Sequence, residues 1–161
     1  MRSRLFPTAA VVVSSVLLAS AIVAFRGAQA SSDIQVTDAW IRWLPAKLPS
    51  AGYMTLTNMS SVTQVLVSAS SPDYGSITMH HTRKSQEMSE MMLVESIEVM
   101  PKMSVRFAQG GYHLMLMHPL HDLHPGDRVP ITLRFADGRS ILVSFAIRAG
   151  NENTWTQIFA K

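Results

Sequence analysis

The 161-residue sequence contains no cysteine. Disulfide bonds are therefore excluded, and the stability of the domain has to come from packing. Blue-copper electron-transfer centres and zinc sites built on cysteine are excluded as well, because both need a thiolate ligand.

The sequence also has few marks of a catalyst. No serine lies in a Gly-x-Ser-x-Gly elbow, there is no glycine-rich phosphate loop, and no pair of carboxylates stands out at a catalytic spacing. We therefore predict a protein that is not an enzyme.

An excess of positive charge is missing from most of the chain. The formal net charge is +3, but Arg2, Arg4 and Arg26 all lie in the first thirty residues, and the remaining Lys and Arg residues balance the Asp and Glu residues. The basic pI of the whole chain is thus no sign of nucleic-acid binding.

The N-terminus has the layout of a secretory signal. Arg2 and Arg4 precede an apolar run from Thr8 to Phe25, and Ala-Gln-Ala ends at Ala30. We predict a signal peptide over residues 1–30, a single domain over 31–161, and a periplasmic location. The apolar run is nearly long enough to span a bilayer, so an uncleaved N-terminal anchor is the alternative, and would be the chain's only contact with the membrane.

Short extended runs separated by turn residues follow Ala30. Seven or more strands at short spacing predict an all-β domain, a Greek-key β-sandwich or an open barrel, and Asp137-Gly138 predicts a hairpin. Residues 149–161 are a candidate last strand. The runs that predict strands are 34–44, 51–58, 64–70, 76–81, 112–117 and the two halves of 128–148.

The segment 84–100 is ambiguous. Met88, Met91 and Met92 have the spacing of one turn of an amphipathic helix, whereas Leu93 to Val99 fits a strand equally well.

Histidine and methionine are concentrated in two of these runs. All six histidines lie between residues 80 and 124. In "YHLMLM" (112–117), alternation places His113, Met115 and Met117 on one face of a strand and two leucines on the other, core-facing side. A His-Met-Met row then faces outward or into a cleft. In "SITMHH" (76–81), the same alternation places His80 opposite the apolar face, which makes it the better candidate ligand of the two neighbouring histidines.

Thioether and imidazole together suit Cu(I). Methionine sulfur is a soft, neutral donor that binds Cu(I) well and Zn(II), Ca(II) or Mg(II) poorly. The remaining methionines have a simpler explanation, since Met88, Met91, Met92, Met100 and Met103 can each be core packing. The three-residue spacing of His118, His121 and His124 could serve a second metal, although prolines mark this segment as a loop whose histidines are more often simply solvated.

The spacing His80-x10-Met91-x21-His113-x-Met115 resembles the ligand motif of the periplasmic PCuAC-type copper chaperones. "DAWIRWLP", "AGYMTLTN", "SPDYGSITMH" and "LHPGDRVPITLRFADG" are similar to other parts of that family, so the resemblance covers residues 33–148.

The resemblance implies a cupredoxin-like β-sandwich that binds one Cu(I) through His80, Met91, His113 and Met115. It also implies that residues 84–92 form a loop or hairpin that returns Met91 to the other three ligands. The implied function is delivery of copper toward cytochrome c oxidase, either directly to an oxidase subunit or through a Sco-type chaperone. Some members carry a His/Met-rich C-terminal tail, whereas residues 148–161 contain neither histidine nor methionine.

Two other functions remain open from the sequence. One is a periplasmic copper buffer or resistance protein without a dedicated acceptor. The other is a metal-independent interaction module whose methionine row is a docking patch.

Overall fold

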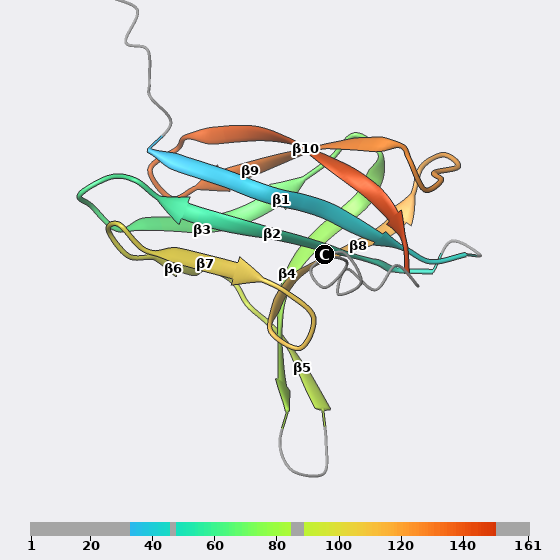
Figure 1. The fold of residues 1–161 in the computed structure, drawn as a ribbon, viewed down its shortest axis with the longest axis horizontal. Helices are drawn as coiled ribbons and strands as arrows, with labels where there is room; N and C mark the ends of the chain where they lie inside the picture. The colour runs from blue at the N-terminus through green and yellow to red at the C-terminus, as the bar shows by residue number, and fades with distance from the viewer. Residues whose placement is uncertain (1–32, 46–47, 85–88, 151–161) are drawn as a thin grey trace, which may run out of the picture.

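A computed structural model describes residues 33–45, 48–84 and 89–150, and this part of the chain is built entirely of strands and connections (Figure 1). The strands are β1 (Ile34–Trp43), β2 (Ser50–Asn58), β3 (Gln64–Ser70), β4 (Tyr74–Lys84), β5 (Ser89–Leu93), β6 (Ile97–Val99), β7 (Ser104–Phe107), β8 (Tyr112–Pro119), β9 (Arg128–Phe135) and β10 (Ser140–Ala149).

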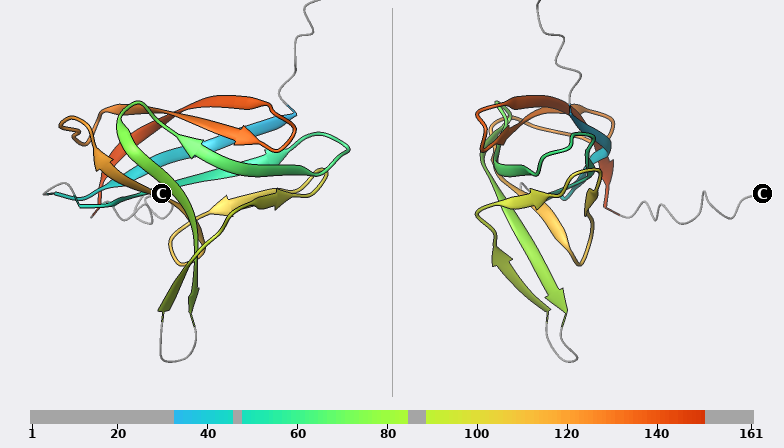
Figure 2. Two further views of the ribbon diagram at one scale, coloured as in Figure 1. Left: turned by 180° about the vertical axis from the view of Figure 1, so that it is seen from behind. Right: turned by 90° about the vertical axis from the view of Figure 1, so that its left-hand side faces the viewer.

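The ten strands form one continuous sheet in the order β5-β4-β8-β7-β2-β1-β10-β9-β3-β6, and β8 also pairs with β2. This sheet curls so that its two halves face each other around the core (Figure 2). The first strand joins the halves, because it pairs antiparallel with β2 and parallel with β10. A bulge at Asp38, where φ is 52°, interrupts the pairing with β2 between Thr37 and Trp40, and the pairing with β10 begins at Trp40. The predicted all-β, cupredoxin-like fold is thereby confirmed.

Both halves of the curled sheet contribute to a core of aliphatic and aromatic side chains. Leu114 and Leu116 of β8 are fully buried, as the alternation in "YHLMLM" predicted. Gly52 of β2 packs against them: a Cβ at this position would lie 3.2 Å from Leu114 Cβ and 3.2 Å from Leu116 Cδ1. The absence of a side chain at Gly52 thus lets β2 and β8 pair over the core. The other completely buried aliphatic side chains are Ile41, Leu56, Leu66, Val99, Val129, Ile131 and Leu133.

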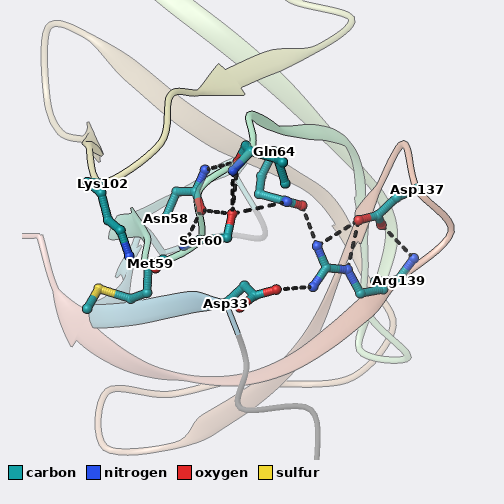
Figure 3. Close-up of polar contacts among 9 residues, drawn as sticks. Asp33, Asn58, Met59, Ser60, Gln64, Lys102, Asp137 and Arg139 are labelled. Atoms are coloured by element: carbon teal, nitrogen blue, oxygen red, sulfur yellow. Dashed lines mark hydrogen bonds and ion pairs between the residues drawn. The ribbon is translucent and has the colours of Figure 1, made fainter.

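One end of the molecule is held by a polar network around Arg139 in the turn before β10 (Figure 3). Its guanidinium donates to Asp33, Asp137 and Gln64, which precede β1, follow β9 and begin β3. Arg139 therefore ties the ends of β1, β9 and β3 to one another.

A hairpin projects from the body of the fold. Strands β4 and β5 pair antiparallel and extend beyond the neighbouring strands, at the bottom of the view in Figure 1. The hairpin implied for residues 84–92 is thus present in its strand parts.

Two sequence interpretations need correction. The helical turn considered for 88–92 is wrong, because Ser89–Leu93 is a strand whose backbone pairs with β4. The short strand β7 was not predicted. Its sequence "SVRF" is only four residues long, and just two of them, Val105 and Phe107, are apolar. Met88, the signal segment 1–30 and the tail 151–161 lie outside the described residues. Within the part that is described, no helix is long and apolar enough to cross a membrane.

Truncating the core side chain of β8 should destabilise the domain. We expect Leu114→Ala to lower the free energy of unfolding by about 2–5 kcal/mol, because it removes buried methyl groups and leaves a cavity. Leu142→Ala is the matched control, since Leu142 is 70% exposed. Urea unfolding followed by circular dichroism measures both, and equal midpoints for the two variants would contradict this description of the core.

Candidate metal centre

The four residues that the motif singles out come from three neighbouring strands. His80 lies on β4, Met91 on β5, and His113 and Met115 on β8. In the sheet, β4 lies between β5 and β8 and is hydrogen-bonded to both. Residues separated by up to 35 positions in the sequence are therefore neighbours in space.

The register of these strands places all four side chains on one face. His80 is paired directly with His113, and Met115 is paired with Thr78, two residues before His80. On the other side of β4, Met91 is paired with Thr82, two residues after His80. Paired residues share a face and alternate residues share a face, so the two histidines and the two methionines project together.

The pair of histidines forms the middle of this arrangement. The imidazole rings of His80 and His113 are stacked, with centroids 5.8 Å apart. Met115 and Met91 stand diagonally from His80 at opposite ends of the pair, a separation of about 7–8 Å between Cα atoms in an antiparallel sheet. Flexible methionine side chains at that spacing are long enough to reach a point between the rings.

Exposure differs strongly among the four residues. His113 is only 6% exposed, His80 and Met115 are half-buried, and Met91 is 50% exposed. The histidine end of the row is therefore covered, whereas the sequence had left open whether it faces outward or into a cleft. The centre is closed around His113 and open to solvent at Met91.

Hydrogen bonds orient the His113 ring. Its Nδ1 lies 3.2 Å from the carbonyl oxygen of Gly111. A carbonyl only accepts, so Nδ1 carries the proton and donates it, and the lone pair is on Nε2. The Nε2 atom of His113 is thereby the one that can bind a metal.

His80 has one bonded and one orphaned ring nitrogen. Its Nε2 lies 2.9 Å from Thr78 Oγ1, whereas its Nδ1 is buried without a hydrogen-bond partner. Buried polar atoms are nearly always paired, and such an exception requires an explanation. A metal ion bound at Nδ1 supplies one in the tautomer whose Nε2–H donates to Thr78 Oγ1, because the lone pair is then on Nδ1.

Both electrostatic effects on His80 favour its neutral form. Burial lowers the pKa of His80, and the nearby His113 ring lowers it further. Only a neutral imidazole has a lone pair for a metal, so the environment of His80 keeps it ready to bind at neutral pH.

Neighbouring residues divide between the two faces of the same strands. Met117 continues the row beyond Met115, whereas Met92 is paired with His81 and takes the opposite face. His81 is partly buried, and its ring contacts that of Tyr112 at 4.5 Å between centroids. Met91, Met100 and Met103 are exposed, so the explanation of these three as core packing is wrong.

The loop histidines do not form a second centre. His121 is paired with Asp73 at 2.9 Å, and the hydrogen bond with that carboxylate raises the pKa of His121. His118 and His124 are exposed. Among residues 33–45, 48–84 and 89–150, no three His, Asp or Glu side chains gather as a metal site would require. The suggestion that His118, His121 and His124 hold a second metal has no support in this geometry.

Sequence reasoning missed the residues that orient the ligands. Thr78 bonds His80 and stands opposite Met115, and the carbonyl of Gly111 fixes His113. The sequence could have indicated Thr78, because residues two apart in a strand share a face and Thr78 is two residues before His80. Nothing in the sequence indicates the role of the Gly111 carbonyl. Chemically, the centre offers two imidazole nitrogens and two thioether sulfurs, all of them neutral donors.

The family model described as "Putative lipoprotein LpqE-like" matches residues 34–147, which include all four of these residues. Two similar proteins are "Uncharacterized protein RP573" of Rickettsia prowazekii (strain Madrid E), 33% identical over 110 residues, and "Putative lipoprotein Lxx21020" of Leifsonia xyli subsp. xyli (strain CTCB07), 30% identical over 124 residues. The first match spans 68% of this chain and 60% of the relative, and the second spans 74% of each.

Solved structures with the same fold include PCuAC domains. The solution structure of Cu(I)-DR1885 from Deinococcus radiodurans is 31% identical, with a TM-score of 0.62 over 78% of this chain and 85% of that one. The copper-bound PCuAC domain of PmoF2 is 22% identical, with a TM-score of 0.62 over 73% and 93% of the two chains. The predicted resemblance to PCuAC proteins is thus confirmed, and the chain belongs to the LpqE-like family.

Proposed function

We propose that this protein binds one Cu(I) ion through His80, Met91, His113 and Met115 and delivers it to an acceptor protein. The observation that carries the proposal is the strand register, which brings the four side chains to one face around the stacked histidines. The buried Nδ1 of His80, which has no hydrogen-bond partner, adds a candidate donor atom.

The donor set selects the metal. Two thioethers and two imidazoles carry no charge and are soft to intermediate donors, which suits a monovalent soft cation. Zn(II), Ca(II) and Mg(II) are held better by sites containing thiolates or carboxylates. In an oxidising compartment, thioethers also avoid the disulfide formation that threatens thiolates.

The relatives agree with this proposal. DR1885, 31% identical to this chain, has been solved with Cu(I), and PmoF2 has a PCuAC domain solved with copper. Membership of a lipoprotein family fits an exported protein, with residues 1–30 as its signal segment and residues 31–161 as the binding domain.

The solvent exposure of the candidate centre at Met91 favours delivery. Met91 is half exposed on a projecting hairpin, so a ligand from an acceptor can approach the ion there while His113 still holds it from the buried side. We propose that the acceptor is the copper site of cytochrome c oxidase, reached directly or through a Sco-type chaperone. A copper buffer without an acceptor is the alternative, and only a transfer experiment separates the two.

Replacing ligands should abolish tight copper binding. We expect the intact protein to withhold one equivalent of Cu(I) from a chromophoric chelator under anaerobic conditions. His113→Asn or Met115→Leu should weaken this binding by at least about tenfold, since each removes a donor worth about 1.4 kcal/mol or more. Met91→Leu should have a similar effect.

The matched control is Met92→Leu, because Met92 lies next to Met91 on the opposite face of β5. It should bind Cu(I) as the intact protein does. If Met91→Leu and Met92→Leu were indistinguishable from the intact protein, Met91 would not be a ligand. If no variant changed binding, the centre would be misassigned and the metal-independent docking patch would become the better explanation.

Delivery predicts a specific defect in cells. Deleting the gene should lower cytochrome c oxidase activity under copper limitation, and the Met115→Leu protein should fail to restore it. Added copper should rescue the defect, because it bypasses the chaperone. Copper sensitivity with normal oxidase activity would instead identify a buffer or resistance protein.

A further inference from the structure

A second group of methionines lies at the other end of the molecule from His80. Met59, Met100 and Met103 are 51%, 56% and 60% exposed, respectively. All three residues therefore lie at the surface. Strand β2 runs from Ala51, which is paired with Met115, to Asn58, which precedes Met59, a distance of about 23 Å at 3.3 Å per residue.

Two connections bring the three residues together. Met59 follows the last residue of β2, and Met103 precedes the first residue of β7. The Asn58 amide donates to the Met103 carbonyl at 2.9 Å, so the pairing of β2 with β7 continues to this point. Met59 is consequently one residue beyond a position that lies directly opposite Met103.

Met100 is held beside Met103 by a tight turn. The amide of Met103 donates to the Met100 carbonyl at 3.1 Å, and Lys102 has a positive φ of 60° between them. Such a turn keeps the two end Cα atoms within about 7 Å. The sulfur of Met100 lies 3.9 Å from Thr63 Oγ1, which places its side chain over the connection that begins with Met59.

Lys102 links this turn to Met59. Its ammonium donates to the Met59 carbonyl, and Figure 3 shows the two side chains next to each other beside Asn58. All three methionines thus surround one hydrogen-bonded junction of the β2–β3 and β6–β7 connections. Cα separations of about 5–7 Å across pairs and turns are within the reach of flexible thioether side chains converging on one ion.

We propose that Met59, Met100 and Met103 form a second, weaker Cu(I) site, separate from the His80 centre. Three thioethers without imidazole bind a soft monovalent cation and offer little to Zn(II) or Cu(II). The positive charge of Lys102 in the same junction opposes cation binding, twice as strongly for a divalent as for a monovalent ion. This site therefore takes Cu(I) at low affinity and releases it readily.

The test is an anaerobic Cu(I) titration of the protein labelled with ¹³C at its methionine methyl groups, followed by NMR. The first equivalent should shift the methyl signals of Met91 and Met115, and further Cu(I) should shift those of Met59, Met100 and Met103. The second binding step should be at least about tenfold weaker than the first, a difference of about 1.4 kcal/mol. Zn(II) at the same concentrations should leave these three signals unmoved.

Variants separate this proposal from the proposed function. The triple variant Met59→Leu, Met100→Leu and Met103→Leu keeps an apolar surface and should lose the second step but retain the first. The His113→Asn, Met115→Leu variant should lose the first step and retain the shifts of the other three methyl groups. The His118→Asn, His121→Asn, His124→Asn variant should retain both steps.

Three results would overturn the second site. One is methyl signals of Met59, Met100 and Met103 that stay fixed through several equivalents of Cu(I). Another is a second step that survives in the triple leucine variant. The third is a second step that disappears with the loop histidines, which would assign it to them instead. Folding of the leucine variant is checked by its unchanged first step.

Discussion

The direct pairing of His80 with His113 is the contact on which the candidate centre depends. The pairing of β4 with β8 fixes at the same time which side chains enter the core, because Met79 and Leu114 are partners in the same ladder. A slip of β8 by one residue would turn His113 inward, away from His80, and would expose the leucines of β8 to water. The hydrophobic burial that drives folding thus also sets the geometry of the four candidate ligands.

Solvent exposure increases across the candidate centre from His113 to Met91. His113 is buried and fixed by the Gly111 carbonyl, His80 is held by Thr78, and Met91 stands half exposed on the projecting hairpin. Ligands fixed in advance lower the entropy that binding would otherwise cost. An exposed, flexible thioether at the rim is the part most easily exchanged for a donor of another protein. The buried His113 can therefore retain the copper ion, while the exposed Met91 allows its release.

Much of this arrangement follows from residue patterns alone. Alternation in "YHLMLM" predicts the buried Leu114 and Leu116 and the shared face of His113 and Met115, because a strand has a period of two. Met91 is different, since its spacing to Met88 and Met92 allows a helical turn, and only the resemblance to PCuAC proteins selects it. Its place on the ligand face follows from pairing with Thr82, which is a tertiary fact.

Other features have no local signal at all. The orphaned Nδ1 of His80 arises from burial by neighbouring strands, and the turn that gathers Met100 and Met103 matters only because β7 pairs with β2. The exposure of those methionines contradicts their usual use as core fillers. Long-range strand pairing decides these points, and a single sequence encodes it only through the whole set of hydrophobic contacts.

The central claim is that one Cu(I) is bound by both histidines and both methionines on the shared face. X-ray absorption at the copper edge, measured on the protein loaded anaerobically with less than one equivalent of Cu(I), tests it most directly. We predict nitrogen and sulfur scatterers in equal number, two of each, with the sulfur contribution reduced by half when Met115→Leu is combined with Met59→Leu, Met100→Leu and Met103→Leu, which remove the proposed second site. A first shell without sulfur, or one that is unchanged in that variant, would contradict the account.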